Sequence, residues 1–224
     1  MALLKSDEEL FAMVRGKLFS AVIGDILDEM HLLHQFLPPE IRPLRDDMVV
    51  VGRAMTVMEQ DILEEDKNAP AFGLMFEALD DLKPSEVYVA SGGSPSYAMW
   101  GELMSTRAMR LGAAGAVVNG QSRDTNGILH LGFATFSLGR YAQDQRPRGR
   151  VTDFRCPLTI GQVNIQPGDL IMGDVDGVLV IPRAAEEEAL ARAIEKVEKE
   201  NLVRIAIERD GIPSAEAFRR FGVM

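Results

Sequence analysis

The stretch from Glu86 to Asp124 constrains the fold most, because it reads as strand, glycine turn, helix, strand and polar loop. "EVYVAS" at 86–91 and "AAGAVV" at 113–118 predict two short buried strands. Between them, "MWGELMSTRAMRLG" at 99–112 predicts a helix with a glycine at its carboxyl end. Strands joined by a helix are typically parallel, so their carboxyl ends meet at one edge of the sheet. Ligands of open α/β sheets collect at that edge.

The polar loop after the second predicted strand, "NGQSRDTNG" at 119–127, carries adjacent opposite charges, Arg123 and Asp124. Both would face the start of the predicted helix, Gly101 to Met104, across a shared crevice. A helix N-terminus can hold a carboxylate, and a guanidinium could bind the same anion. Glu102 and Asp124 are hard oxygen ligands that suit Mg²⁺ or Mn²⁺. An anion site beside a metal suits a 2-oxo acid, whose keto oxygen the metal polarises.

A purely structural role accounts for the same residues equally well when only their spacing is considered. Arg123 and Asp124 could form an ion pair or cap the loop, and Glu102 is a common residue in a first helical turn. No other stretch offers a stronger site: there is no Gly-x-Ser-x-Gly elbow, P-loop or complete dinucleotide fingerprint. His31, His34 and His130 are too scattered to suggest a metal cluster.

The rest of the chain predicts one α/β domain over residues 1–224, with alternating strands and helices followed by short strands separated by turns. Residues 184–211 predict one long helix, and a terminal helix follows. Ser20 and Ser214 are the expected N-caps of two helices. An irregular loop is expected at 61–73 and a basic loop at 140–150.

Composition narrows the class of protein. The formal net charge of −10 disfavours binding to nucleic acid, and the single cysteine, Cys156, excludes an intrachain disulfide. No apolar run approaches the roughly 18 residues of a membrane span. The N-terminal segment turns acidic within seven residues, unlike a secretion signal. We therefore expect a soluble cytoplasmic protein that does not bind membranes.

Three segments carry a resemblance to a known family: "WGELMSTRAMRLGAAGAVVNGQSRD", "LGFATFSLG" and "IQPGDLIMGDVDGVLVIP". Together they resemble the RraA-like family, which includes 4-hydroxy-4-methyl-2-oxoglutarate / 4-carboxy-4-hydroxy-2-oxoadipate aldolases and the regulator of ribonuclease E activity. The resemblance runs from about Ser20 to Met224. It implies an α-β-β-α sandwich of the swivelling β/β/α type. It also implies a homotrimer or homohexamer with active sites between subunits and with helices 184–222 packed on a neighbouring subunit.

The resemblance also implies roles for the candidate residues. Asp124 would bind Mg²⁺ or Mn²⁺ directly, and Glu102 would reach the ion through water. Glu200 of a neighbouring subunit, with Glu198 as a second possible match, would also reach it through water. Arg123 would bind the pyruvyl part of the substrate and stabilise its enolate. The substrate carboxylate would lie at the helix start, Gly101, where the N–H groups of Leu103 and Met104 would hold it.

The activity implied is that of a class II, metal-dependent pyruvate aldolase. It would cleave a 4-hydroxy-2-oxo acid to pyruvate after a metal-held water takes the 4-hydroxyl proton. Oxaloacetate decarboxylation, which passes through the same enolate, should accompany the cleavage. One departure is Gly127, where many family members carry an acid three positions after the aspartate. The alternative is a non-catalytic RraA-type regulator that binds a ribonuclease.

Overall fold

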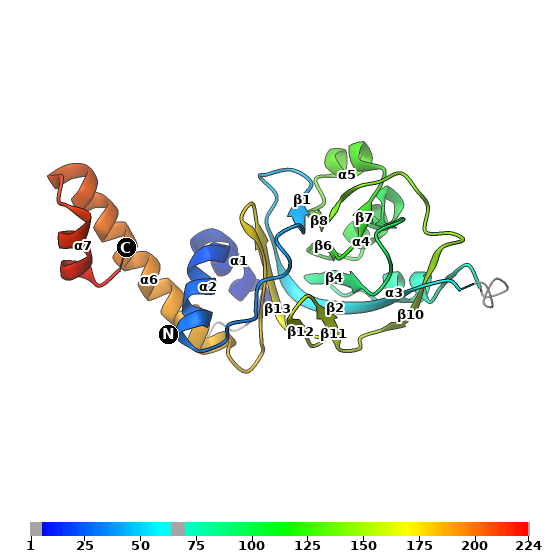
Figure 1. The fold of residues 1–224 in the computed structure, drawn as a ribbon, viewed down its shortest axis with the longest axis horizontal. Coiled ribbons are helices and arrows are strands. Elements are labelled where there is room, and N and C mark those ends of the chain that lie inside the picture. Colours follow the sequence, from blue (N-terminus) through cyan, green and yellow to red (C-terminus); the bar gives the residue numbers. More distant parts are fainter. Residues whose placement is uncertain (1–5, 64–69, 224) are drawn as a thin grey trace.

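One long strand, β2 (Val50–Asp61), organises the main sheet of the computed structural model (Figure 1). It is rich in Val and Met and is buried along nearly its whole length. On one side β2 pairs in parallel with β4 (Glu86–Ser91). On the other side it pairs antiparallel with β13 (Leu170–Asp174) near its start and with β10 (Gly149–Phe154) near its end. β2 therefore joins the parallel and antiparallel halves of the sheet.

The parallel half continues from β4 to β6 (Gly115–Val118) and then to β8 (Thr135–Ser137). This confirms the parallel pairing predicted across the 86–124 stretch. Each of these strands leads into a short strand of a second sheet, and the second sheet is also parallel. Its members are β5 (Ala98–Trp100), β7 (Gln121–Ser122) and β9 (Gly139–Arg140).

Residues 6–63 and 70–223 are described by the structure, so 64–69, part of the loop expected at 61–73, lie outside the described residues. The helices are α1 (Asp7–Lys17), α2 (Ser20–Glu29), α3 (Met75–Asp80), α4 (Glu102–Arg110), α5 (Thr125–Leu131), α6 (Glu186–Asp210) and α7 (Ser214–Phe221). The remaining strands are β1 (Arg42–Pro43), β3 (Phe72–Gly73), β11 (Leu158–Ile160), β12 (Val163–Ile165) and β14 (Gly177–Ile181). No helix within the described ranges is long and apolar enough to cross a bilayer.

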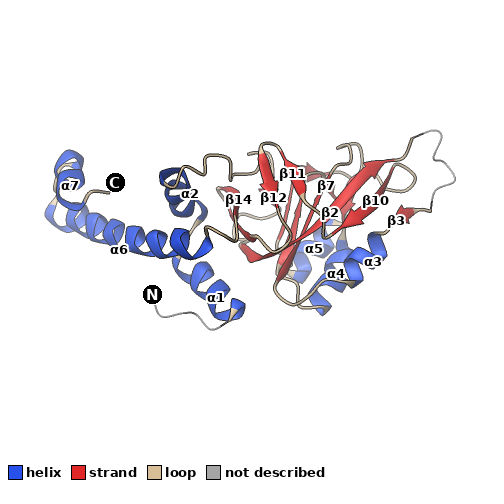
Figure 2. Cartoon of the chain, turned by 90° about the horizontal axis from the view of Figure 1, so that it is seen from below, coloured by secondary structure: helices blue, strands red, loops and turns tan. Residues whose placement is uncertain are grey.

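Helices cover both outer faces of the curled sheet, as Figure 2 shows. One hydrophobic cluster joins α1, α2 and the start of α6 to β13 and β14. A second, larger cluster lies between the rest of the sheet and helices α3, α4 and α5. The layers are therefore helix, strand, strand and helix, which confirms the predicted α-β-β-α sandwich.

Three local predictions differ from the structure. The helix expected at 99–112 begins only at Glu102, because Ala98–Trp100 forms β5 and Trp100 is buried. Ser20 and Ser214 are first helical residues rather than N-caps, since Phe19 and Pro213 occupy the cap positions. The backbone N–H and hydroxyl of Ser20 instead donate to the buried Asp174 carboxylate, at 2.7 and 2.6 Å. The long C-terminal helix predicted at 184–211 is confirmed as α6.

A buried arginine ties the helices to the sheet. Arg53 of β2 donates from Nε to Asp7 Oδ2 at 2.8 Å and from Nη1 to Glu186. Asp7 begins α1 and Glu186 begins α6, so both carboxylates also lie at positively polarised helix starts. The guanidinium carbon lies 5.2 Å from the ring centroid of Phe11. The side chain of Arg53 is only 10% exposed, so water replaces these contacts poorly.

We predict that Arg53→Ala lowers the free energy of unfolding by about 2–3 kcal/mol, because it leaves the largely buried Glu186 carboxylate without its partner. Urea denaturation followed by circular dichroism measures the change. Arg45→Ala is the matched control, because Arg45 pairs with Asp47 on the surface and should leave the denaturation midpoint unchanged. Equal midpoints for both variants would contradict the role given to Arg53.

Candidate active site

The candidate site lies at the carboxyl ends of the second parallel sheet. Gly101 follows β5, Arg123 follows β7, and the loop after β9 brings Asp144 beside Ala98. A cavity of about 360 Å³ opens at this point. Its lining includes Arg123 and Asp124 together with the start of α4, residues Gly101, Leu103 and Met104. The crevice expected between the Arg-Asp pair and the helix start is therefore present.

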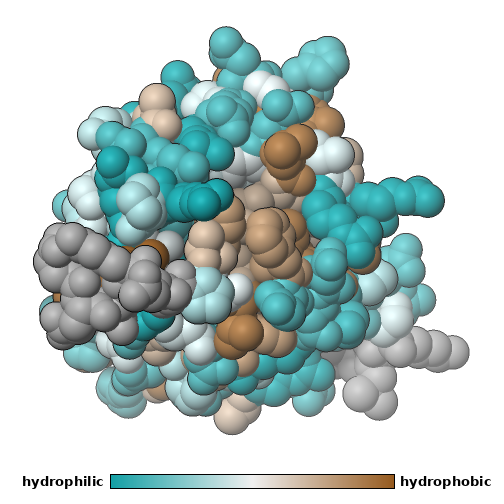
Figure 3. All heavy atoms as spheres, turned by 90° about the vertical axis from the view of Figure 1, so that its right-hand side faces the viewer, coloured by the Kyte–Doolittle hydropathy of each residue, from teal (hydrophilic) through white to brown (hydrophobic). Residues whose placement is uncertain are grey.

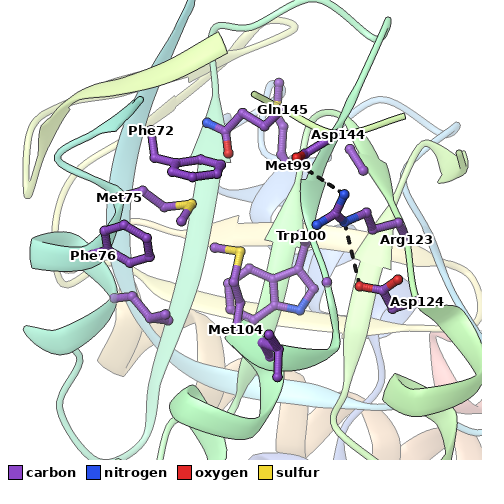
Figure 4. Close-up of a pocket in the computed structure, with 14 residues that line it drawn as sticks. Phe72, Met75, Phe76, Met99, Trp100, Met104, Arg123, Asp124, Asp144 and Gln145 are labelled. Atoms are coloured by element: carbon purple, nitrogen blue, oxygen red, sulfur yellow. Dashed lines mark ion pairs between the residues drawn. The ribbon is translucent and has the colours of Figure 1, made fainter. Parts of the chain in front are cut away.

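Arg123 is held between two carboxylates, as Figure 4 shows. Its backbone N–H donates to the carbonyl of Trp100 at 2.9 Å, which fixes the base of the side chain. Its Nη1 lies 3.1 Å from Asp144 Oδ1, and its Nε lies 3.6 Å from Asp124 Oδ2. The side chain is 37% exposed, so the guanidinium is both oriented and open to an entering anion.

Asp124 adopts a left-handed backbone conformation, with φ 54° and ψ 35°, at the position before α5. Aspartate tolerates this region better than most residues, but the conformation still costs energy. Its carboxylate lies against Gly101, where an added Cβ would come within 3.1 Å of Asp124 Oδ2. The absence of a side chain at Gly101 thus makes room for this carboxylate beside the helix start.

Buried aromatic contacts fix the start of α4. The indole of Trp100 packs against Tyr88 and Phe133, with ring centroids 4.9 and 6.0 Å away. Its Nε1 donates to Ser105 Oγ at 2.7 Å, and Ser105 Oγ donates to the Gly101 carbonyl at 3.0 Å. First-turn N–H groups have no acceptor within their own helix. The start of α4, whose residues Gly101, Leu103 and Met104 line the cavity, is therefore anchored by these contacts.

Glu102 lies beside the cavity rather than in its lining, because its side chain covers Gly127 of α5. A Cβ added at Gly127 would meet Glu102 Cδ at 2.5 Å and Oε2 at 2.8 Å. The carboxyl of Glu102 therefore fills the space that a side chain at position 127 would need. Glu102 still packs against the helix that Asp124 begins.

Glu198 and Glu200 lie on α6, beside a separate hollow that Lys17 and Phe19 also line. Figure 1 shows α6 projecting away from the sandwich on the side opposite α3 and α4. The two glutamates thus do not meet Arg123 within one chain. That Glu200 completes the site of a neighbouring subunit stays a prediction.

Sequence reasoning missed two polar groups of the loop at 140–150, which was predicted only to be basic. Asp144 pairs with Arg123, and Gln145 lines the same cavity. The Nε2 of Gln145 donates to Glu59 Oε2 at 2.8 Å, although the two residues are 86 positions apart. An acidic residue inside a basic tract was the only local signal, and nothing in the sequence linked Gln145 to Glu59.

Glu59 is a fully buried carboxyl behind Gln145. Within the described part of the chain, its Oε1 has no hydrogen-bond partner. Burial, with a smaller contribution from the negative charge of Asp61, raises the pKa of Glu59 to about 8. The carboxyl is therefore protonated at neutral pH and holds the pocket loop through Gln145 as a neutral group.

The carboxylates of the site suit a metal that keeps much of its water. In the described ranges, no three His, Cys, Asp or Glu side chains cluster closely enough to hold an ion by themselves. Mg²⁺ is commonly bound by one or two carboxylates, with water and substrate oxygens completing its shell. Asp124, with a half-exposed carboxylate, and Glu102 behind it fit that type of site.

The fold and the site together define an α/β sandwich protein whose cavity, at the ends of parallel strands, holds an arginine between two aspartates. A family model described as Aldolase/RraA matches residues 20–180, and the chain belongs to this RraA-like family. Protein DlpA of Legionella pneumophila is 32% identical over 189 residues, which cover 84% of this chain but only 30% of DlpA. The chain thus spans less than a third of the length of that relative.

Two further proteins are similar over most of their length. A protein named "Putative 4-hydroxy-4-methyl-2-oxoglutarate aldolase" in Halalkalibacterium halodurans is 35% identical over 175 residues, covering 78% of this chain and 77% of the relative. The crystal structure of an uncharacterized protein from Pseudomonas syringae pv. tomato superimposes with a TM-score of 0.81 at 26% identity. It covers 94% of this chain and 96% of that protein.

We predict that Glu59→Gln removes a pH-dependent loss of stability. Between pH 4.5 and about 8 the unfolded state releases the Glu59 proton while the folded state retains it, so wild-type stability falls as pH rises. The free energies of unfolding of Glu59→Gln and wild type should therefore diverge over that window, by about 4 kcal/mol at its upper end. Denaturation curves at each pH measure the difference, with the exposed Glu40→Gln as control. A difference that does not vary with pH would contradict the assignment.

Proposed function

We propose that the protein is a lyase of the class II, metal-dependent pyruvate aldolase type. It would cleave a 4-hydroxy-2-oxo acid to pyruvate and also decarboxylate oxaloacetate. The observation that carries this proposal is the meeting of Arg123 and Asp124 with the start of α4 in one cavity. The aldolase name of the relative from Halalkalibacterium halodurans supports the same reaction class.

The substrate would bind through its 2-oxo acid end. Its carboxylate would accept hydrogen bonds from the N–H groups of Leu103 and Met104, where the helix dipole favours negative charge. The guanidinium of Arg123 would lie at the keto oxygen, held in place by Asp144. Trp100 and Ser105 would keep the helix start from shifting as the anion enters.

Asp124 would hold Mg²⁺ or Mn²⁺, with Glu102 reaching the ion through water. In a homotrimer or homohexamer, Glu200 of the partner subunit would reach it through water as well. The bound ion would supply Lewis-acid polarisation of the keto oxygen. The left-handed backbone of Asp124 aims its carboxylate toward Gly101, beside the proposed carboxylate site.

In the proposed cleavage, water polarised by the Asp124 and Glu102 carboxylates accepts the proton of the 4-hydroxyl group. The C3–C4 bond breaks, its electron pair forms the pyruvate enolate, and C4 leaves as a carbonyl. Arg123 places a positive charge beside the enolate oxygen, where negative charge develops. Protonation at C3 then yields pyruvate. Decarboxylation of oxaloacetate would give the same enolate and use the same groups.

We predict that Arg123→Ala and Asp124→Asn each lower pyruvate release from oxaloacetate by about 100-fold or more. Asparagine also tolerates the left-handed conformation at position 124, so the loop should keep its shape. A coupled dehydrogenase assay with Mg²⁺ measures pyruvate, and Arg110→Ala on the exposed end of α4 is the control. Wild-type release no faster than with Mg²⁺ alone, together with ribonuclease binding that survives Arg123→Ala, would favour the non-catalytic regulator instead.

We predict that Gly127→Ala separates stability from activity. Alanine favours the α5 helix by up to about 1 kcal/mol over glycine, so the unfolding midpoint should not fall. The added Cβ must push the Glu102 carboxyl aside, so half-maximal pyruvate release should require a several-fold higher Mg²⁺ concentration. Titrating Mg²⁺ in the oxaloacetate assay measures this change. An unaltered Mg²⁺ requirement would remove Glu102 from the proposed metal site.

A further inference from the structure

The cavity has two chemically different walls (Figure 4). Arg123, Asp124, Asp144 and Gln145 form its polar wall. The opposite wall is apolar and comes from β3, α3, β5 and α4. It includes Phe72, Met75, Phe76, Leu79, Trp100 and Met104.

The apolar wall is part of the folded core at its base and reaches the surface at its rim. Met75, Leu79 and Trp100 are buried, whereas Phe76 is 56% exposed. The rings of Phe72 and Phe76 meet edge to face, with centroids 5.6 Å apart. Figure 3, which looks at this side of the molecule, shows an apolar patch bordered by hydrophilic side chains. The wall therefore presents a firm aromatic and methionine surface beside the anion site.

Charge in the cavity is concentrated at one end. Arg123 is the only cationic side chain among the described residues of the lining, and it already faces Asp124 and Asp144. A second carboxylate at the far end of a substrate would lose water against the apolar wall and gain no cation there. An alkyl or aromatic group in the same place would instead leave water for matching apolar surface.

We infer that the substrate is a 2-oxo acid whose distal end is apolar, carrying an aryl or branched alkyl group rather than a second carboxylate. This inference rests on the proposed function, because it assigns the head of the substrate to Arg123 and the start of α4. The cavity volume of about 360 Å³ lies within the range typical of small-ligand sites. The apolar wall and the polar wall line the same cavity, so a single small molecule can contact both.

Binding of two matched ligands by calorimetry in the presence of Mg²⁺ tests the inference without requiring turnover. 2-Oxo-4-phenylbutanoate and 2-oxoglutarate share the 2-oxo acid head and differ in the distal group, and neither has the 4-hydroxyl needed for cleavage. The phenyl ligand should bind at least about tenfold more tightly to the wild-type protein. Equal affinities, or tighter binding of 2-oxoglutarate, would overturn the inference.

Phe76→Arg tests the apolar wall directly, because it places a cation at the exposed rim where the distal group lies. It should lower the preference for the phenyl ligand by about tenfold or more, through both weaker phenyl binding and tighter 2-oxoglutarate binding. Met109→Arg is the control, since it adds the same charge at an exposed position of α4 outside the cavity lining and should leave the preference unchanged. Thermal unfolding checks that both variants are folded.

Cleavage assays distinguish failure of this inference from failure of the proposed function. Pyruvate release is compared for 4-hydroxy-2-oxo-4-phenylbutanoate, which yields one pyruvate and benzaldehyde, and 4-hydroxy-4-methyl-2-oxoglutarate, which yields two pyruvates. Per cleavage event, a several-fold higher kcat/KM is expected for the phenyl substrate. Release from the dicarboxylate alone would retain the lyase and overturn the apolar assignment. Preferential binding of the phenyl ligand without any cleavage would overturn the lyase and keep the apolar wall as a ligand site. If Phe76→Arg changes the oligomer mass in sedimentation but not ligand preference, the wall is a subunit contact and the inference fails.

Discussion

Backbone pairing among three short strands is the constraint on which the site depends. β5, β7 and β9 are each only two or three residues long, yet each follows a buried strand of the main sheet along the chain. Trp100 accepts the backbone N–H of Arg123, and Ser122 accepts that of Tyr141, both at 2.9 Å. Because the side chains of the site follow these strands immediately, the guanidinium and the helix start cannot separate without breaking the ladder. A rigid scaffold thus carries functional groups that lie in loops.

Several features of the site oppose stability, and the surrounding structure compensates for them. Asp124 has a left-handed backbone, Glu59 is a buried carboxyl with one oxygen unpaired within the described residues, and Phe76 exposes an aromatic ring. Strain, buried polar groups and exposed apolar surface are each unfavourable in a purely structural protein. All three lie in or directly behind one cavity, a distribution expected where residues are selected for binding rather than for folding.

The fold was predictable where local patterns determine it, and the site only where its residues are close in the chain. Periodicity and turn residues were enough for the parallel pair across 86–124 and for the long helix α6. Helix periodicity failed at Trp100, because burial against Tyr88 and Phe133 makes that residue part of a strand. The contact between Gln145 and Glu59 joins segments far apart in sequence, so no spacing rule could indicate it.

The contact between Glu102 and Gly127 shows why the residues of a motif are better compared by their positions in space than by their spacing in the sequence. Many members of the resembled family carry an acid at this position, and the sequence showed Gly127 as a departure from them. The side chain of Glu102 lies over Gly127, so a carboxyl group occupies the space beside that backbone position after all. A side chain at 127 would require the Glu102 carboxyl to move, and an acidic one would also repel it at close range. Glycine at this position thus leaves the space that the observed conformation of Glu102 occupies.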